Sequence, residues 1–285
     1  MKKSSLIAQV DKIYRHARQG SIQTRRGYLK CIKLFVIWLE KTYNMQNLNN
    51  LSNKHLAAFV EHMLEQGNKS SYIIKILSAV RYFHNQLPGP RYALETDNSK
   101  LGVPKREPLG DRAWTQSEYE MLINLAVARG QEWIADVLTL QKELGLRVHE
   151  AIRLYRMDAE RALTSGKLRV KGKGGKVRQT IELTPAAEAA LRRAVRRVKR
   201  GARLFVPENQ GAHIIIKKVQ DFIRENRPQK EGEQLTTHGL RYCYAQRRMD
   251  ELKDQGIPKD QAEMKVAQEM GHNRQRVTRG YCTRR

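Results

Sequence analysis

The chain has 285 residues, with 54 Lys and Arg against 29 Asp and Glu, which gives a formal net charge of +25 at pH 7. Hydrophobic residues make up 40% of the sequence. That share is enough to build packed cores and excludes a disordered polycation. Because so much like charge repels itself in a compact fold, we expect an anionic partner, most of all nucleic acid. Ribosomal and membrane-surface proteins are also basic, so charge alone does not name the partner.

The three cysteines, Cys31, Cys243 and Cys282, are odd in number, far apart and in no C-x-x-C arrangement. They indicate a reducing compartment, with neither a disulfide framework nor a zinc site. Polar residues at positions 9, 11 and 12 interrupt any signal peptide, and no apolar run approaches the roughly 18 residues of a membrane span. We therefore expect an intracellular protein without membrane contact, metal or cofactor.

The length favours two domains. Residues 1–90 read as four helices, near 6–14, 22–39, 52–66 and 70–87, with Ser21 and Ser52 as N-caps and Gly67 and Pro88 as stops. A basic outer face is compatible both with DNA contact and with an ordinary solvated surface. Its expected members are Arg25, Arg26, Lys30, Lys33, Lys69, Lys75 and Arg81.

Residues 91–111 are expected to be a linker, because the stretch 88–112 holds four prolines and three glycines and lacks periodicity. The second domain, 112–285, begins with a capping box at 115–118. Its helices are expected at 115–129 and 132–144, after the cap Thr184-Pro185, and near 212–225, 237–255 and 258–270. A basic hairpin is expected at 167–183, around a glycine-rich turn. The predicted fold class is mainly α with one small antiparallel β-sheet.

The charge is concentrated between Arg161 and Phe205, where fourteen Lys and Arg face two acidic residues. A solubilising surface rarely needs so uneven a ratio. The hairpin and the following helix therefore form a patch on which a duplex backbone could lie.

Two stretches combine arginine with residues that could orient or assist it. In ELGLRVHEAIRL, residues 143–154, Arg147 follows a helix stop, and Glu150 could orient its grip on phosphate; the commoner alternative is a surface ion pair. In TTHGLRYCYAQRR, residues 236–248, His238 and Arg241 share a helix face and can converge on one ligand. A histidine at a helix start is more often a cap or a packed core group.

Two further candidates are basic. Lys173 and Lys176 in the hairpin turn GKGGK could reach a phosphate, although the turn lacks the spacing of an NTP-binding loop. The stretch EMGHNRQRVTRGYCTRR, residues 269–285, places Tyr281 nine residues after His272 among five arginines. The alternative for this stretch is a solvated basic tail with a chance aromatic.

Each fragment is weak by itself, but their order is specific: G-L-R-x-x-E, a β-turn lysine, H-x-L-R-Y, G-H, and a tyrosine nine residues later. In this order the sequence resembles the tyrosine recombinase (phage integrase) family over nearly its whole length. Type IB topoisomerases share the chemistry but not this context. The resemblance implies a four-helix core-binding (SAM-like) domain at 1–90 and a catalytic domain at 112–285.

The same resemblance implies a site-specific DNA recombinase that integrates, excises or resolves DNA elements without a cofactor. Tyr281 would attack the scissile phosphorus, giving a 3′-phosphotyrosine and a free 5′-hydroxyl. Arg147 and Arg241 would hold the non-bridging oxygens, and His272 would hydrogen-bond the phosphate. Lys173 would protonate the departing oxygen. His238 is the expected base, because a free phenol, with a pKa of about 10, is protonated at neutral pH.

The partners implied are double-stranded DNA and three further copies of the chain, in a homotetramer on two sites, in the nucleoid-associated cytoplasm of a prokaryote or phage host. Only CTRR follows Tyr281, whereas many relatives carry another C-terminal helix, so the tetramer is held differently or the sequence is shortened. Helices begin almost at Met1, which favours action on core sites alone. The two basic domains are expected to close as a clamp around the duplex.

Two rival interpretations remain at this stage. A non-catalytic DNA-binding or architectural protein could keep the fold, but binding alone does not require Tyr281 or the ordered set around it. A basic ribosome-associated protein would explain the charge but not the motifs.

Overall fold

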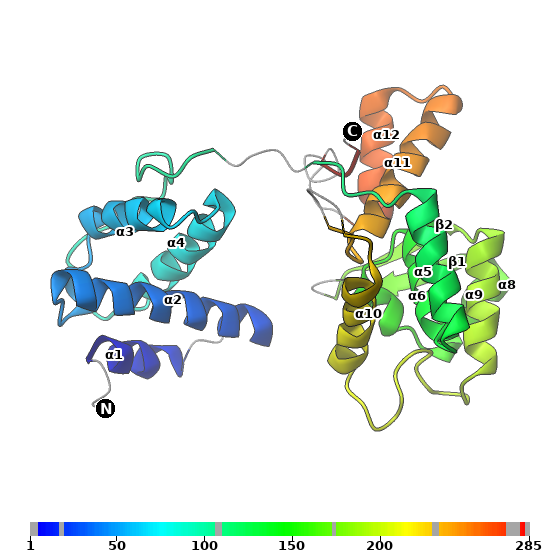
Figure 1. Ribbon diagram of the computed structural model, residues 1–285, viewed down its shortest axis with the longest axis horizontal. Helices are drawn as coiled ribbons and strands as arrows, with labels where there is room; N and C mark the ends of the chain where they lie inside the picture. The colour runs from blue at the N-terminus through cyan, green and yellow to red at the C-terminus, as the bar shows by residue number, and fades with distance from the viewer. Residues whose placement is uncertain are drawn as a thin grey trace. The chain divides into compact units, whose positions relative to one another are not determined.

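The computed structural model describes residues 5–16, 20–105, 110–172, 175–229, 234–271 and 280–282. The chain forms two compact units, Met1–Glu107 and Pro108–Arg285 (Figure 1). In the described residues both are helical apart from one two-stranded antiparallel sheet in the second unit, so the predicted fold class is confirmed. Within the described ranges, no helix combines the length and the apolar character needed to cross a bilayer.

The first unit contains the four predicted helices. They are α1 (Ser5–Tyr14), α2 (Ile22–Tyr43), α3 (Asn53–Glu65) and α4 (Ser70–His84), with a short 3₁₀ helix, η1 (Leu48–Asn50), between α2 and α3. Ser21 caps α2 by accepting from the Thr24 N–H at 3.1 Å, as expected for an N-cap serine. The apolar stripes of these helices meet in one core, where the rings of Phe35 and Phe59 pack edge to face with centroids 4.9 Å apart.

The segment after α4 corrects the expected linker. Leu101 and Val103 are buried in the core of the first unit. Arg81, expected on the outer face, instead reaches this segment, donating from Nε to the Glu95 carbonyl at 2.7 Å and from Nη1 to the Asn98 Oδ1 at 2.9 Å. Residues 91–105 therefore belong to the first unit. The proline and glycine content that suggested a linker reflects turns of a packed segment.

The second unit is built around α6, which packs against α5, α9 and α11. Its elements are α5 (Gln116–Ala128), α6 (Glu132–Leu144), α7 (Val148–Ile152), α8 (Arg156–Ser165), β1 (Lys167–Lys171), β2 (Val177–Glu182), α9 (Pro185–Arg196), α10 (Ala212–Asn226), α11 (Gly239–Asp254) and α12 (Lys259–Glu269). The predicted capping box is present, since Thr115 and Glu118 each accept the other's backbone N–H. Thr184 caps α9 with Pro185 in its first turn, also as predicted.

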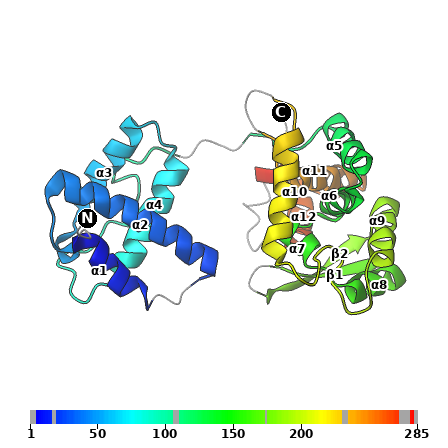
Figure 2. The same ribbon diagram turned by 60° about the horizontal axis from the view of Figure 1, so that its bottom comes forward.

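Two helices of this unit, α7 and α8, were not predicted. The buried residues of α8 are Ala159 and Ala162 alone, so its sequence carries almost no apolar stripe to recognise. Helix α7 has only five residues, too few to display a period. Both helices belong to the stretch of chain between α6 and β1, for which the sequence predicted no element. Figure 2 shows them beside the hairpin.

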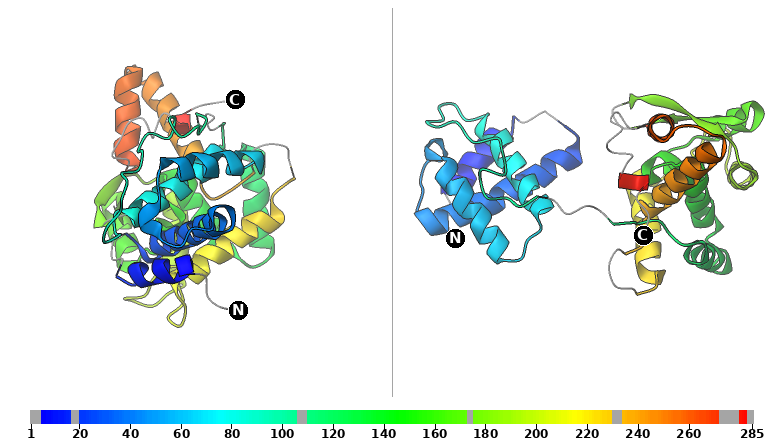
Figure 3. Two further views of the ribbon diagram at one scale, coloured as in Figure 1. Left: turned by 90° about the vertical axis from the view of Figure 1, so that its left-hand side faces the viewer. Right: turned by 90° about the horizontal axis from the view of Figure 1, so that it is seen from above.

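The hairpin forms where it was predicted, with Val170 opposite Arg178 and Lys171 opposite Val177. Its inner face carries the buried Leu168, Val170 and Thr180 and packs on α8, while β2 also contacts α12 (Figure 3). This contact brings the strand to the end of the helix that precedes His272 in sequence. The stretch 249–264 forms the end of α11, a turn and the start of α12.

Candidate active site

Tyr281 is a packed residue and not part of a solvated tail. It is 8% exposed and belongs to a small core formed with α11 and α12. Its ring lies 4.5 Å from that of Tyr242, tilted by 34°. Its hydroxyl lies 2.7 Å from Nε2 of His238, from which it is separated by 43 residues of sequence. The fold therefore brings a phenol and an imidazole into direct hydrogen-bond contact.

His238 stands at the N-terminal boundary of α11. Part of the residue faces solvent. Even so, removal of the ring from water and the positive charges of Arg241, Arg147 and Arg112 lower the pKa of His238 to about 4. The imidazole is thus neutral at physiological pH, and with its proton on Nδ1 it can accept the phenolic proton at Nε2.

Arg241 lies in the first turn of α11 and is fully buried. Its guanidinium donates to two backbone carbonyls, from Nη1 to Gly145 and from Nη2 to Met270 at 3.1 Å. Its Cζ is 5.8 Å from the centroid of the Tyr281 ring. Burial and the neighbouring Arg147 lower the pKa of Arg241 to about 10, which leaves it charged at neutral pH.

Arg147 precedes α7, and its contacts exclude a simple surface ion pair. It donates from Nη1 to Oε1 of Glu150 at 2.9 Å and from its backbone N–H to Oε2 at 2.8 Å. The Glu150 side chain is fully buried. Burial would raise the pKa of Glu150, but Arg178, the Arg147 N–H and the Arg147 charge together hold it below its ordinary value. Arg147 also donates to the Met270 carbonyl at 3.5 Å, so both arginines meet at one oxygen.

The structure thus brings together four of the six predicted site residues: Arg147, His238, Arg241 and Tyr281. Lys173 and His272 lie outside the described residues. Among the described residues, no group of three His, Cys, Asp or Glu side chains could hold a metal ion.

The sequence interpretation missed Arg178, Tyr242 and the carbonyl of Met270. A signal for Arg178 was available, since it occupies the same face of β2 as Thr180, opposite the buried Val170. The role of the Met270 carbonyl could not be predicted in this way, because every residue type has a backbone carbonyl.

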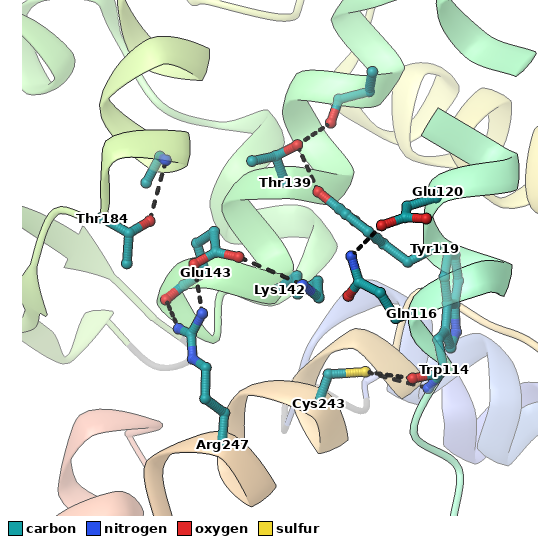
Figure 4. A network of polar contacts seen from close by, with 12 residues as sticks. Trp114, Gln116, Tyr119, Glu120, Thr139, Lys142, Glu143, Thr184, Cys243 and Arg247 are labelled. Carbon is teal, nitrogen blue, oxygen red and sulfur yellow. Dashed lines mark hydrogen bonds and ion pairs between the residues drawn. The ribbon is translucent and has the colours of Figure 1, made fainter. Parts of the chain in front are cut away.

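Polar contacts fasten α11, which carries both His238 and Arg241, to its surroundings. The Trp114 N–H donates to Sγ of Cys243 at 3.2 Å, and Arg247 donates to the Glu143 side chain and carbonyl at the end of α6 (Figure 4). Burial raises the pKa of Cys243 to about 11, so it remains a neutral thiol. These contacts fix the helix that carries His238 and Arg241 from two neighbouring segments.

The end of α12 is tied to α11 by a second set of contacts. Glu269 accepts from the Tyr244 hydroxyl at 2.8 Å and from two nitrogens of Arg248 at 2.9 and 3.0 Å. The Tyr244 ring packs against Gly145, whose φ is +61°; a Cβ there would lie 2.6 Å from the ring. Only glycine fits this left-handed position, and its carbonyl is one of the two that Arg241 uses.

Members of the predicted basic patch lie in different surroundings. On α9 and at its C-cap, Arg193 and Arg197 pair with the fully buried Asp136, and Arg192 pairs with Glu188. Four others line a groove of about 680 Å³ that also reaches His149, Glu150 and Arg153. The cationic side chains of this basic groove are Arg153, Arg161, Arg169, Lys171 and Arg203.

Comparison with known proteins gives the family. The model of the phage integrase N-terminal SAM-like domain matches residues 9–88, and the model of the integrase family matches residues 107–247. The second match ends before His272 and Tyr281. Tyrosine recombinase XerC of Pseudomonas aeruginosa (strain LESB58) is 28% identical over 250 residues, covering 84% of this chain and 80% of that protein. Tyrosine recombinase XerD of Halalkalibacterium halodurans is 25% identical over 268 residues, covering 88% and 84%.

Solved structures show the same fold at low identity. A lambda integrase dimer bound to a COC′ core site superposes with a TM-score of 0.69 at 17% identity, covering 100% of this chain and 96% of that one. The Tn1549 transposon integrase with circular intermediate DNA gives 0.68 at 13%, covering 98% and 95%. A lambda integrase tetramer bound to a Holliday junction gives 0.67 at 16%, covering 97% and 76%.

Fold and relatives together define an enzyme that breaks and rejoins DNA strands. The chain belongs to the tyrosine recombinase (phage integrase) family, as its motif order predicted. Site-specific recombination is therefore its function, and the alternative of a non-catalytic DNA-binding protein finds no support among these relatives.

Proposed function

We propose that Tyr281 is the nucleophile of this recombinase and that Arg147, His238 and Arg241 assist its attack. The observation that carries the proposal is the 2.7 Å contact between the Tyr281 hydroxyl and Nε2 of the neutral His238, beside the buried Arg241. The hydroxyl of Tyr244, which also lies on α11, instead donates to Glu269, and burial and that carboxylate raise its pKa.

The chemical step follows from these positions. His238 accepts the phenolic proton as the Tyr281 oxygen forms a bond to the scissile phosphorus. The bond from phosphorus to the 5′ oxygen breaks, and a proton, which we assign to Lys173, goes to that oxygen. The products are a 3′-phosphotyrosine and a 5′-hydroxyl. Since the ester bond is exchanged and not hydrolysed, rejoining is the reverse step and needs no external energy source.

Arg147 and Arg241 would stabilise the charge that grows on the non-bridging oxygens. Both already donate to the Met270 carbonyl, which supports a common target for their guanidinium groups. His272, two residues further along the chain, would add a hydrogen bond to the phosphate.

We assign core-site binding to the first unit and catalysis to the second, which together would enclose the duplex as a clamp. The basic groove supports phosphate contacts next to the site, because five cationic side chains line it. A homotetramer on two DNA sites is proposed by analogy with the lambda integrase tetramer on a Holliday junction. Because its partner is DNA, we also propose that the protein acts in the cytoplasm and is associated with the nucleoid.

The test is covalent trapping. A suicide duplex, nicked so that the 5′ fragment diffuses away after cleavage, should trap the parental protein as a DNA adduct. Peptide mapping should find the link at Tyr281. The Tyr281→Phe variant should bind the same duplex and give no adduct. An adduct of that variant, or a link mapped to Tyr242 or Tyr244, would overturn the assignment.

A further inference from the structure

Arg178 is an arginine on the inward face of the hairpin. It stands on β2 opposite Val170, which is 1% exposed, and its own side chain is 10% exposed. A guanidinium removed from water to this extent is costly unless hydrogen bonds replace its hydration. The contacts of Arg178 therefore indicate what the residue does.

Its two principal contacts are with Glu150, which binds Arg147, and with the end of α12, where the Met270 carbonyl accepts from Arg147 and Arg241. Nη2 donates to Oε2 of Glu150 at 2.9 Å, the same oxygen that accepts the Arg147 N–H. Nε donates to the carbonyl of Glu269 at 2.8 Å, one residue before the Met270 carbonyl shared by Arg147 and Arg241.

The chain leaving α12 passes directly over this side chain. Gly271 has φ +66°, and a Cβ built there would lie 3.1 Å from Cδ of Arg178. The last carbonyls of a helix lack intrahelical partners and carry partial negative charge. Arg178 thus donates a hydrogen bond to one of these carbonyls and packs against the turn that follows the helix.

We propose that Arg178 is a positioning residue for strand cleavage, acting through Glu150 and the end of α12 on Arg147 and Arg241. The proposal rests on the function proposed above. Without Arg178, Oε2 of Glu150 loses a charge-assisted hydrogen bond in a buried setting. The carboxylate is then free to turn toward Arg147 alone, which neutralises and displaces the guanidinium that should face the phosphate.

The experiment compares two suicide duplexes in single-turnover cleavage by the full chain. One has an ordinary scissile phosphate. In the other, a methyl group replaces one non-bridging oxygen, so the group is uncharged and needs less help from arginine. Arg178→Met keeps the length and apolar stem of the side chain. It should slow cleavage of the ordinary duplex by roughly ten- to a hundredfold, as expected for one or two lost charge-assisted hydrogen bonds. On the methylated duplex the loss should be several-fold smaller, with DNA affinity unchanged on both.

Arg178→Lys retains one charge and should fall between the parent and Arg178→Met. The matched control is Arg156→Met, which removes an arginine that also pairs with one carboxylate, Glu160, and one carbonyl, Val198. Rates of this control, corrected for the folded fraction from thermal melts, should equal the parental rates on both duplexes.

Equal losses by the Arg178 variants on both duplexes, or losses explained by the folded fraction, would show a merely structural role and overturn the proposal. Parental rates for these variants, with Tyr281→Phe inactive, would overturn it while leaving the proposed function intact. Failure of the parental protein to form any adduct would instead overturn the proposed function.

Discussion

The pH dependence of cleavage tests the role of His238 most directly. Only the neutral imidazole can accept the proton of Tyr281, so activity falls where His238 becomes protonated. A histidine with the ordinary pKa of 6.5 is about nine-tenths protonated at about pH 5.5, and the rate there would drop about tenfold from its value near pH 7.5. With the pKa of His238 lowered to about 4, the ring is almost wholly neutral at about pH 5.5, and the rate should stay within about 10% of its plateau.

The lowered pKa of His238 is that of the DNA-free protein, so the assay should separate the free enzyme from the DNA complex. The second-order rate constant at limiting protein reports the free enzyme, whereas the first-order rate at saturation reports the complex. A bound phosphate brings negative charge to Arg147 and Arg241, which offsets part of their effect on His238. The acid limb should therefore lie at higher pH in the first-order rate than in the second-order constant.

His238→Gln is the control. Glutamine occupies similar space and cannot act as a base, so the variant should be slower by roughly a hundredfold or more and should lose the acid limb. Duplex binding, measured over the same pH range, removes any contribution from affinity. An acid limb of the second-order constant centred near pH 6.5, or one that persists in His238→Gln, would refute this reasoning.

Three further predictions concern other residues of the second unit. Lys173→Ala should cleave slowly with an ordinary duplex and recover with a 5′-thiolate leaving group, which needs no proton; continued slow cleavage of the sulfur substrate would exclude Lys173 as the general acid. Tyr242→Leu removes the ring 4.5 Å from Tyr281 and should slow cleavage about three- to tenfold, whereas Tyr242→Phe keeps the ring and most of the rate; equal rates for the two variants would contradict a role for that ring contact. Arg153→Ala in the basic groove should lower the log–log salt slope of DNA binding by about 0.9, while Arg193→Ala, which breaks a pair with a buried carboxylate, should lower the melting temperature and leave the slope unchanged. A reduced salt slope for Arg193→Ala, with an unchanged slope for Arg153→Ala, would show that DNA lies on α9.

The sequence predicted those elements whose burial is periodic. Helices α2, α3 and α4 carry continuous apolar stripes, and each formed where the stripe indicated. Helix α8 buries only alanines, and Leu101 and Val103 are two isolated apolar residues that pack into the core of the first unit, in a segment that Arg81 fixes at Glu95 and Asn98. Neither case leaves a local period, so neither was predicted.

In the candidate site, too, some residues could be predicted from the sequence and others could not. The order of short motifs identified Arg147, His238, Arg241 and Tyr281, because reactive side chains are specific to residue type. The acceptors that orient two of them are the carbonyls of Gly145 and Met270, which any residue could supply. Their role follows from where α6 and α12 end, and this is a property of the tertiary fold.

The use of carbonyls has a consequence for catalysis. A fully buried cation such as Arg241 needs acceptors, but a carboxylate partner would cancel the charge that the phosphate requires. The carbonyls of Gly145 and Met270 provide hydrogen bonds without a formal charge, at helix ends where the backbone dipoles are negative. Arg147 and Arg178 share the single carboxylate of Glu150. Arg147, Arg178 and Arg241 together with Glu150 thus keep a net positive charge, to which Arg112 beside His238 adds. In the proposed mechanism, this positive charge would stabilise the negative charge that develops on the non-bridging oxygens during attack by Tyr281, and so would favour the transition state over the bound substrate.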